Sequence, residues 1–168
     1  MIELGSDGHP LQPEDMTVAE SESRNGKLGT PNVVAQDGRA MIVYSKQGGA
    51  IIARIWNQAN GLSGSAVELL QQKGFMVNRA LLAVDGEGIS LCLGETRPEG
   101  SELRFAKISF AGEVQTMQTL AASRMPILTF DFRVNEAGMA LIWSEAALGG
   151  AQIFARRFSP EGVASTRV

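Results

Sequence analysis

Three cations and one tryptophan are the residues of this chain whose types and spacing could carry chemistry. Arg54, Lys107 and Arg156 each follow an alanine at the same place in a recurring apolar run, and Trp56 follows Arg54 by two positions. A symmetric fold would place equivalent cations so that they bind an acidic ligand, such as a carboxylated glycan, and a flat aromatic ring suits a sugar face. Alternatively, each long side chain covers a neighbouring repeat and pairs with an acidic turn residue.

Acidic residues recur in two sets of matching positions. One set lies in the turns ahead of the cations and would supply their ion-pair partners: Asp37, Asp85 and Glu136. The second set is Glu95 and Glu145, and a pair of carboxylates is what glycoside hydrolysis uses. The first repeat has Lys46 at that position, so the repeat favours a structural role for these two glutamates over a catalytic pair.

No residue cluster predicts a metal or cofactor site. Residues 85–88, Asp-Gly-Glu-Gly, come nearest to a calcium loop but are more typical of a hairpin turn. Cys92 is the single cysteine, so it forms no intrachain disulfide and cannot bind zinc by itself. It lies in an apolar run far in sequence from His9, the single histidine, and we interpret it as a buried strand residue. The sequence therefore predicts no cofactor and no enzyme.

Composition is typical of one globular domain. The chain has 168 residues, 44% of them hydrophobic, and 19 glycines without a collagen-like period. A net charge of −3 argues against binding to nucleic acid or anionic lipid. No run approaches the length of a membrane span. The first residues lack the features of a signal peptide, which leaves the compartment open between the cytosol and, if the start is processed, secretion or the periplasm.

The elements that must position the candidate residues recur three times. A turn rich in Gly or acidic residues and a following apolar strand occupy residues 37–45, 86–94 and 136–144. A second apolar strand follows in each repeat, and then a turn whose glycines are Gly61, Gly112 and Gly162, at intervals of 51 and 50 residues. With short apolar runs before and after, each repeat is predicted to contain four strands, a pattern typical of propeller blades.

The repeats resemble the divergent blade repeats of bacterial β-propellers. In these a glycine turn, an apolar strand ending in an aromatic residue, and an Ala-Arg-x-Phe strand recur. The matching segments here are 38–44 with 53–56, and 138–143 with 155–158; the middle repeat has Leu93 for the aromatic residue and Lys107 for the arginine. The resemblance covers residues 31–168 and implies an architecture without implying an activity. The chain is similar to sialidases in architecture alone, since no Ser-x-Asp-x-Gly-x-Thr-Trp box occurs.

We therefore predict an all-β fold of three four-stranded antiparallel blade-like repeats of about 50 residues, a partial β-propeller, with a β-trefoil as the alternative. Residues 1–30 are predicted to hold a half-repeat strand and a polar arm. The repeats are 31–78, 79–126 and 127–168, within one structural domain. The run 17–20 falls where the fourth strand of a preceding repeat is expected.

Three blades are too few to close a propeller ring, so uncovered faces and edges are expected to drive association. The sequence thus favours a non-enzymatic protein-binding or assembly module that is completed by a second copy of the chain or by a partner protein. Two alternatives stay open. One is a lectin-like or glycosidase-related propeller that binds a glycan through Arg54, Lys107, Arg156 and Trp56; the other is a fragment of a larger secreted propeller protein.

Overall fold

The computed structural model describes residues 18–19, 28–46, 49–71, 76–85, 88–115, 117–159 and 163–164. Most of the predicted half-repeat and arm at 1–30 lies outside these residues. The described part consists of strands and turns, without a helix. Its strands are β1 Asn32–Gln36, β2 Arg39–Lys46, β3 Ala50–Asn57, β4 Gly61–Gln71, β5 Met76–Asp85, β6 Gly88–Arg97, β7 Gly100–Ile108, β8 Gln118–Ser123, β9 Ile127–Asn135, β10 Gly138–Ala147 and β11 Gly150–Phe158.

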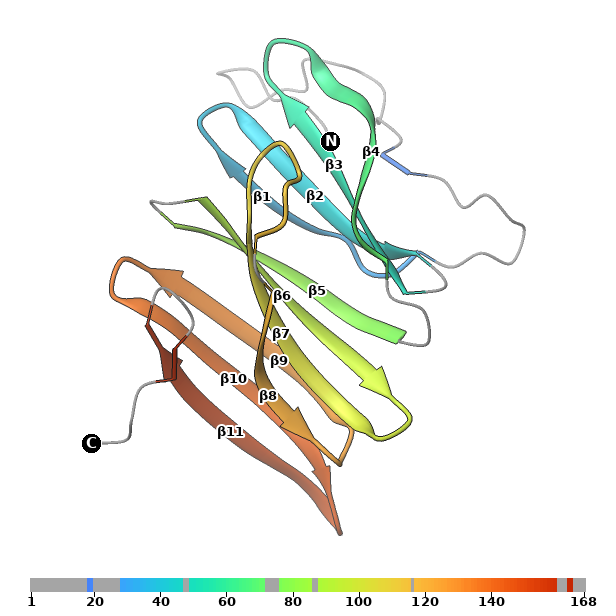
Figure 1. Ribbon diagram of the computed structural model, residues 1–168, viewed down its shortest axis with the longest axis vertical. Coiled ribbons are helices and arrows are strands. Elements are labelled where there is room, and N and C mark those ends of the chain that lie inside the picture. Colours follow the sequence, from blue (N-terminus) through green and yellow to red (C-terminus); the bar gives the residue numbers. More distant parts are fainter. Residues whose placement is uncertain are drawn as a thin grey trace, which may run out of the picture.

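The strands form three antiparallel sheets in chain order (Figure 1). Sheet 1 is β1-β2-β3-β4, sheet 2 is β5-β6-β7-β8, and sheet 3 is β9-β10-β11. The predicted all-β, antiparallel class is confirmed. Sheet 3 has three strands among the described residues, and the run 164–168, where its fourth strand is expected, lies outside them except for Ala164. Pairing within the described part stays inside each sheet, so these residues form neither the closed barrel that a β-trefoil requires nor a closed propeller ring.

Two-residue hairpins set the same register at the start of each sheet. Asp37 and Gly38 connect β1 to β2 with φ values of 51° and 70°, the left-handed pair that a type I′ turn needs. The hairpin partners are Gln36 with Arg39, Asp85 with Gly88, and Asn135 with Gly138. Arg39, Gly88 and Gly138 are therefore equivalent, and positions along the three sheets can be compared by counting from them.

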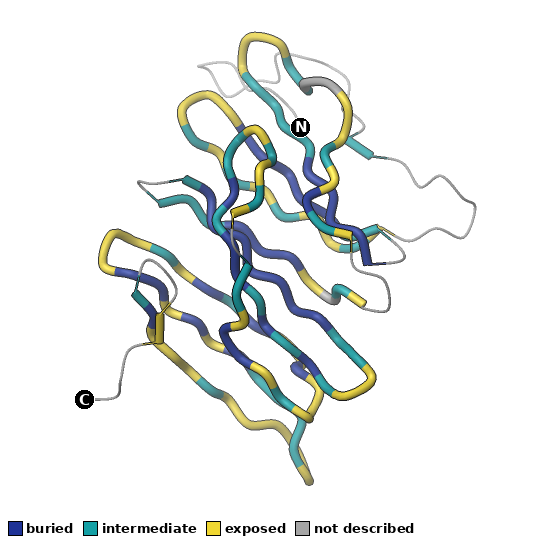
Figure 2. The backbone as a smooth tube through the Cα atoms, viewed as in Figure 1, coloured by how far each residue is buried: buried dark blue, intermediate teal, exposed yellow. Residues whose placement is uncertain are grey.

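The sheets stack face to face, with sheet 2 in the middle (Figures 1 and 2). We call the face toward the preceding sheet the front face and the opposite one the back face. Because side chains alternate along a strand, each sheet contributes two different sets of residues to the stack. The back face of sheet 1 packs on the front face of sheet 2 in a cluster that includes Met41, Val43, Ile51, Ile89, Leu91 and Leu93.

The back face of sheet 2 packs in the same way on the front face of sheet 3. Their shared cluster includes Cys92, Leu103, Phe105, Phe132, Leu141 and Trp143. The first strands of the sheets are also joined by polar contacts. Leu82 N on β5 donates to Asn32 Oδ1 on β1 at 2.7 Å, and Arg79 Nη1 donates to the Phe130 carbonyl on β9 at 3.2 Å. The stack is therefore held at its first strands as well as through its faces.

Candidate functional site

Arg156 lies on the front face of sheet 3 and covers the neighbouring sheet. Its Nη1 donates to the carbonyl of Leu120 on β8 at 3.1 Å, and its guanidinium carbon lies 5.7 Å from the ring centroid of Trp143. Trp143 is buried and stacks on Phe154 with 5.4 Å between ring centroids. Arg156 therefore joins sheets 2 and 3, as the second of the two sequence interpretations describes.

The structure shows that Lys107 is not equivalent to the two arginines. Lys107 pairs with Ser90 in the sheet 2 ladder, whereas Arg156 pairs with Leu141 and Arg54 with Ile42. The true counterpart in sheet 2 is the preceding residue, since Leu91 pairs with Ala106. A shift of one residue moves a side chain to the other face of a sheet. Lys107 therefore lies on the back face, and the expected equivalence of the three cations is wrong.

The pairing expected between a cation and an acidic turn residue is present at Lys107, whose ammonium forms an ion pair with Asp85. Arg54 and Trp56 lie together on the front face of sheet 1, where Trp56 is partly exposed. The Nε of Arg54 is buried and has no hydrogen-bond partner in the described residues. The four predicted site residues thus occupy three different sheets or faces, so they do not form one common rim.

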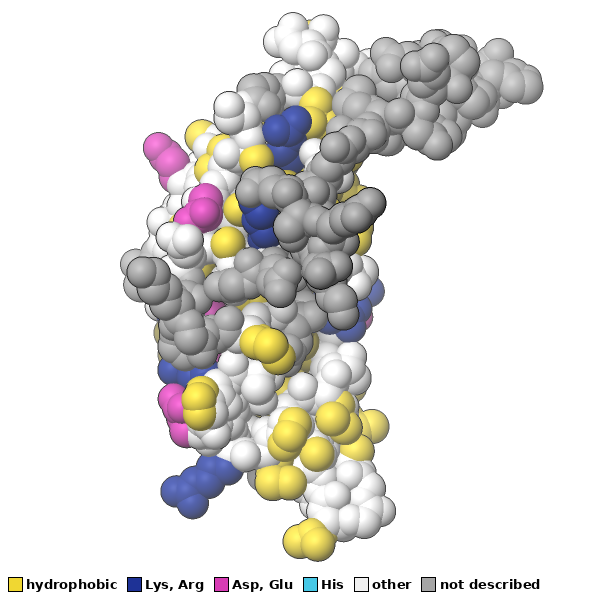
Figure 3. Space-filling model, turned by 90° about the vertical axis from the view of Figure 1, so that its right-hand side faces the viewer, with side chains coloured by type: hydrophobic (Ala, Val, Ile, Leu, Met, Phe, Trp, Pro, Cys, Tyr) yellow, Lys and Arg dark blue, Asp and Glu magenta, His cyan; other side chains and the backbone are white. Residues whose placement is uncertain are grey.

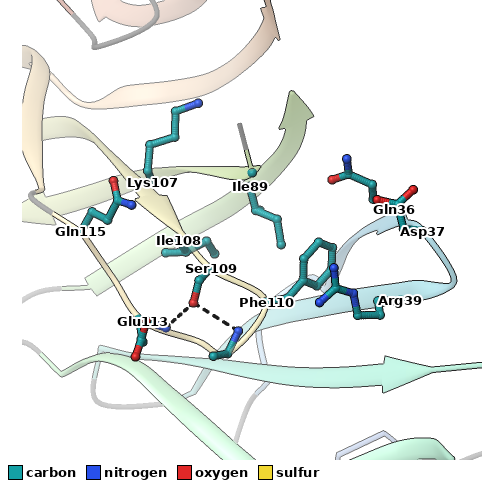
Figure 4. A pocket seen from close by; sticks show the side chains of 12 residues that line it. Gln36, Asp37, Arg39, Ile89, Lys107, Ile108, Ser109, Phe110, Glu113 and Gln115 are labelled. Atoms are coloured by element: carbon teal, nitrogen blue, oxygen red, sulfur yellow. Dashed lines mark hydrogen bonds between the residues drawn. The ribbon is translucent and has the colours of Figure 1, made fainter. Parts of the chain in front are cut away.

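A cavity of about 640 Å³ lies at the hairpin end of sheets 1 and 2 (Figure 4). The β1–β2 hairpin and the β7–β8 loop line it, and the guanidinium of Arg39 stacks 4.5 Å from the centroid of the Phe110 ring. Ser109 Oγ accepts hydrogen bonds from Ala111 N and Glu113 N at 3.2 and 3.3 Å, which fixes the loop. Among the described residues no cluster of three or more His, Cys, Asp or Glu side chains could hold a metal ion.

The two repeat-related glutamates are both engaged by donors close to them. Glu95 is fully buried between Arg97 Nη2 at 3.4 Å and Arg104 Nη1 at 3.5 Å. Glu145 accepts from Trp143 Nε1 at 2.7 Å and from Ser123 Oγ at 2.5 Å. The carboxylates lie in different sheets, and each one stabilises its own surroundings. This buried network was missed from the sequence, because a glutamate near a strand end is usually solvated.

Cys92 is fully buried between sheets 2 and 3, which confirms the interpretation from the sequence. Burial raises the pKa of its thiol well above the ordinary range, because the thiolate would lose its hydration. The thiolate is the reactive form, so the side chain is predicted to be inert in the folded protein.

We expect Cys92 to resist a disulfide reagent such as DTNB at pH 8 and to react once the chain is unfolded in denaturant. Since the thiol pKa is higher in the folded than in the unfolded chain, its contribution to stability is complete below the unfolded value of about 8.5 and is lost as the pH rises above it. Rapid labelling of the folded chain would contradict this placement. A serine at position 92 controls for background reaction.

The back face of sheet 3 is the largest departure from the repeat. Ile142 and Ile153 are 48% and 75% exposed, whereas their counterparts in sheet 2, Cys92 and Leu103, are fully buried under the next sheet. Exposed hydrophobic side chains gather at this lower end of the molecule (Figure 3). A shallow hollow of about 280 Å³ opens on the same face, and its lining includes Asp131, Arg133, Ala140, Ile142, Ala155 and Arg157.

Strand β11 is the outer edge of sheet 3 and is mostly exposed (Figure 2). It pairs with β10 along one side. Along its other side, the described residues contribute a single isolated bridge, between Phe158 and Ala164. An edge of this kind offers backbone donors and acceptors to another strand. We call the back face of sheet 3 together with β11 the open end.

The front face of sheet 1, at the other end of the stack, is partly covered by Val18 and Ala19. Ala19 packs on Tyr44, Ala50 and Ile52. Beside this contact lies an apolar cavity of about 480 Å³, and its lining includes Val18, Ala19, Leu28, Val33, Ile42 and Tyr44. Val33 is 54% exposed, although its counterparts Leu82 and Phe132 are buried by a preceding sheet.

No protein-family model matches the chain, and a search of curated proteins finds no match. None of the described residues belongs to a helix that is long and apolar enough to cross a membrane.

Proposed function

We propose that this chain is a non-enzymatic protein-binding and assembly module of partial-propeller construction, whose open end takes a further β-sheet. The observation that carries the proposal is the exposure of Ile142 and Ile153 at ladder positions that are buried in sheet 2. The repeat already shows how such a face is used, because the equivalent face of sheet 2 packs against the front face of sheet 3.

Stacking and edge pairing would both contribute to the association. Full burial of an aliphatic side chain is worth about 1.5–3 kcal/mol, so the two isoleucines supply a substantial apolar contact. Pairing along β11 adds backbone hydrogen bonds, the mode used by proteins that extend a sheet with a strand from another chain. The charged side chains around the hollow would then favour a partner sheet that carries complementary charges in one register. These side chains are Asp131, Arg133 and Arg157.

A binding role is favoured over catalysis by how the candidate acidic groups are held. Glu95 is held between two arginines, and Glu145 accepts from Trp143 and Ser123. Asp85 is ion-paired to Lys107. Carboxylates that are each satisfied within the packed sheets serve stability, whereas a hydrolase needs two that converge on one substrate bond.

Light scattering on the full chain and on the double variant Ile142→Lys/Ile153→Lys tests the proposal. We expect the full chain to have a mass above the 17.9 kDa of one chain, and the double variant to fall to that value with its unfolding transition retained. Two charged side chains on the face would have to be desolvated in the interface, which opposes stacking. The matched control is Met76→Lys, the same change at an exposed residue of sheet 2. A stable, strictly monomeric full chain, or a double variant that assembles normally, would refute the proposal.

A further inference from the structure

We infer that the occupant of the open end is a second copy of this chain, with Val18 and Ala19 of one copy lying against β11 of the other. This inference rests on the proposed function and names its partner. Three observations on the described residues lead to it: the position of Ala19, the unpaired Nε of Arg54, and the two incomplete ends of the stack.

Ala19 occupies the place of a fourth-strand residue. Leu69 on β4 and Leu120 on β8 are equivalent residues, and they belong to the clusters between sheets 1 and 2 and between sheets 2 and 3. Ala19 precedes Leu69 by 50 residues, one repeat, and packs against the cluster that contains Tyr44. Tyr44 is the counterpart of Trp143, which shares its cluster with Leu120. Ala19 thus contacts sheet 1 where a fourth-strand residue of a preceding sheet would.

Arg54 lacks the acceptor that its counterpart has. Arg156 donates to the carbonyl of Leu120, a fourth-strand residue of the preceding sheet. Arg54 stands at the same ladder position in sheet 1, and its buried Nε has no hydrogen-bond partner in the described residues. The equivalent acceptor is the carbonyl of Ala19. Pairing with a second chain would hold the Ala19 carbonyl in a defined orientation, and a hydrogen bond to it would offset the cost of the buried Arg54 donor.

The two ends of the stack are complementary. Among the described residues, the back face of sheet 3 and the outer edge of β11 are largely uncovered, whereas the front face of sheet 1 is partly covered by Ala19. Placing sheet 3 of one copy before sheet 1 of another repeats the packing seen twice within the chain. This packing would bury Val33 and Ile142, as their counterparts are buried within the chain. It would also cover the apolar cavity beside Val33.

The same contact made twice would close the assembly. Two chains related by a twofold axis would each give sheet 3 to the other's sheet 1, and six sheets would complete a ring. Six lies within the four to eight blades of closed propellers. Both open ends are used up, which limits the assembly to two chains.

Engineered disulfides test the arrangement on the full chain. In sheet 2, Leu103 pairs with Ala121, next to Leu120, so Ala19 is expected beside Ile153 of the second copy. The double variant Ala19→Cys/Ile153→Cys should form a disulfide-linked dimer in high yield under mild oxidation. Within one chain these residues lie at opposite ends of three sheets packed about 10 Å apart, beyond the roughly 7 Å Cα separation a disulfide tolerates. Ala19→Cys/Met76→Cys is the matched control and should stay uncrosslinked.

The outcomes separate this inference from the proposed function. Crosslinking at 19 and 153, with none in the control, supports the exchange between two copies. An assembly that dissociates on Ile142→Lys/Ile153→Lys but shows no 19–153 crosslink would overturn this inference and leave the proposed function standing with another arrangement or partner. A monomeric full chain would overturn both.

Discussion

Replacing Phe132 with alanine is expected to lower the free energy of unfolding by about 3–5 kcal/mol, the range for a large aromatic side chain removed from a packed core. Phe132 is 2% exposed and belongs to the cluster that joins sheets 2 and 3. The truncation removes the apolar burial of the ring and leaves a cavity, because the two sheets are fixed by their other contacts. Urea unfolding followed by tryptophan fluorescence measures the change.

Val33→Ala is the matched control for this effect, since Val33 stands at the same ladder position in sheet 1. It is 54% exposed, so its truncation should cost less than about 1 kcal/mol. A similar loss in the two variants would mean that the ends of the stack do not differ in burial. The comparison therefore tests the arrangement of the sheets as well as the packing of one residue.

Glu95→Gln is expected to destabilise the folded chain by about 3 kcal/mol, the lower part of the range for breaking a buried ion pair. The substitution preserves shape while removing the charge that faces Arg97 and Arg104. Both arginine side chains are partly exposed, at 21% and 16%, so water can hydrate them in part and limits the loss. Chemical denaturation at low and high salt measures the change in the free energy of unfolding. This change should depend little on salt, because the site is buried.

Glu102→Gln provides the comparison, because Glu102 also binds Arg97, at 2.9 Å, but its side chain is 22% exposed. The Glu102→Gln substitution is expected to lower the free energy of unfolding by less than about 1 kcal/mol. This effect should become smaller as the salt concentration rises. Equal effects of the two substitutions would show that Glu95 is hydrated in solution and does not stabilise the stack.

The fold class was predictable because its signals are local. Apolar runs of strand length, separated by turns such as Asp37-Gly38, predict antiparallel hairpins without knowledge of the tertiary fold. Register was harder to predict. The Ala-Lys pair at 106–107 looks like the Ala-Arg pairs of the other repeats. In the strand pairing, however, it is offset by one position, so Lys107 lies on the opposite face of its sheet from Arg156.

The sequence predicted that the chain would have uncovered sheet faces, but it did not predict which residues would form them. The shortage of repeats indicated uncovered faces, whereas the named cations and Trp56 were chosen from sequence similarity between strands. Which apolar residues are exposed depends on where the stack ends, and that is a property of the assembled sheets. Ile142 and Cys92 illustrate this, since both occupy apolar runs in sequence and only their position in the stack separates them.

Each sheet is made from one uninterrupted stretch of chain, and short connectors lead from β4 to β5 and from β8 to β9. Because the main contacts between the described sheets join adjacent sheets, cooperativity is expected to pass from neighbour to neighbour, as in solenoid proteins. Such a molecule can be lengthened or shortened by whole units through gene duplication or deletion. The terminal units would then change their exposed surfaces, while the interior units would keep their packing.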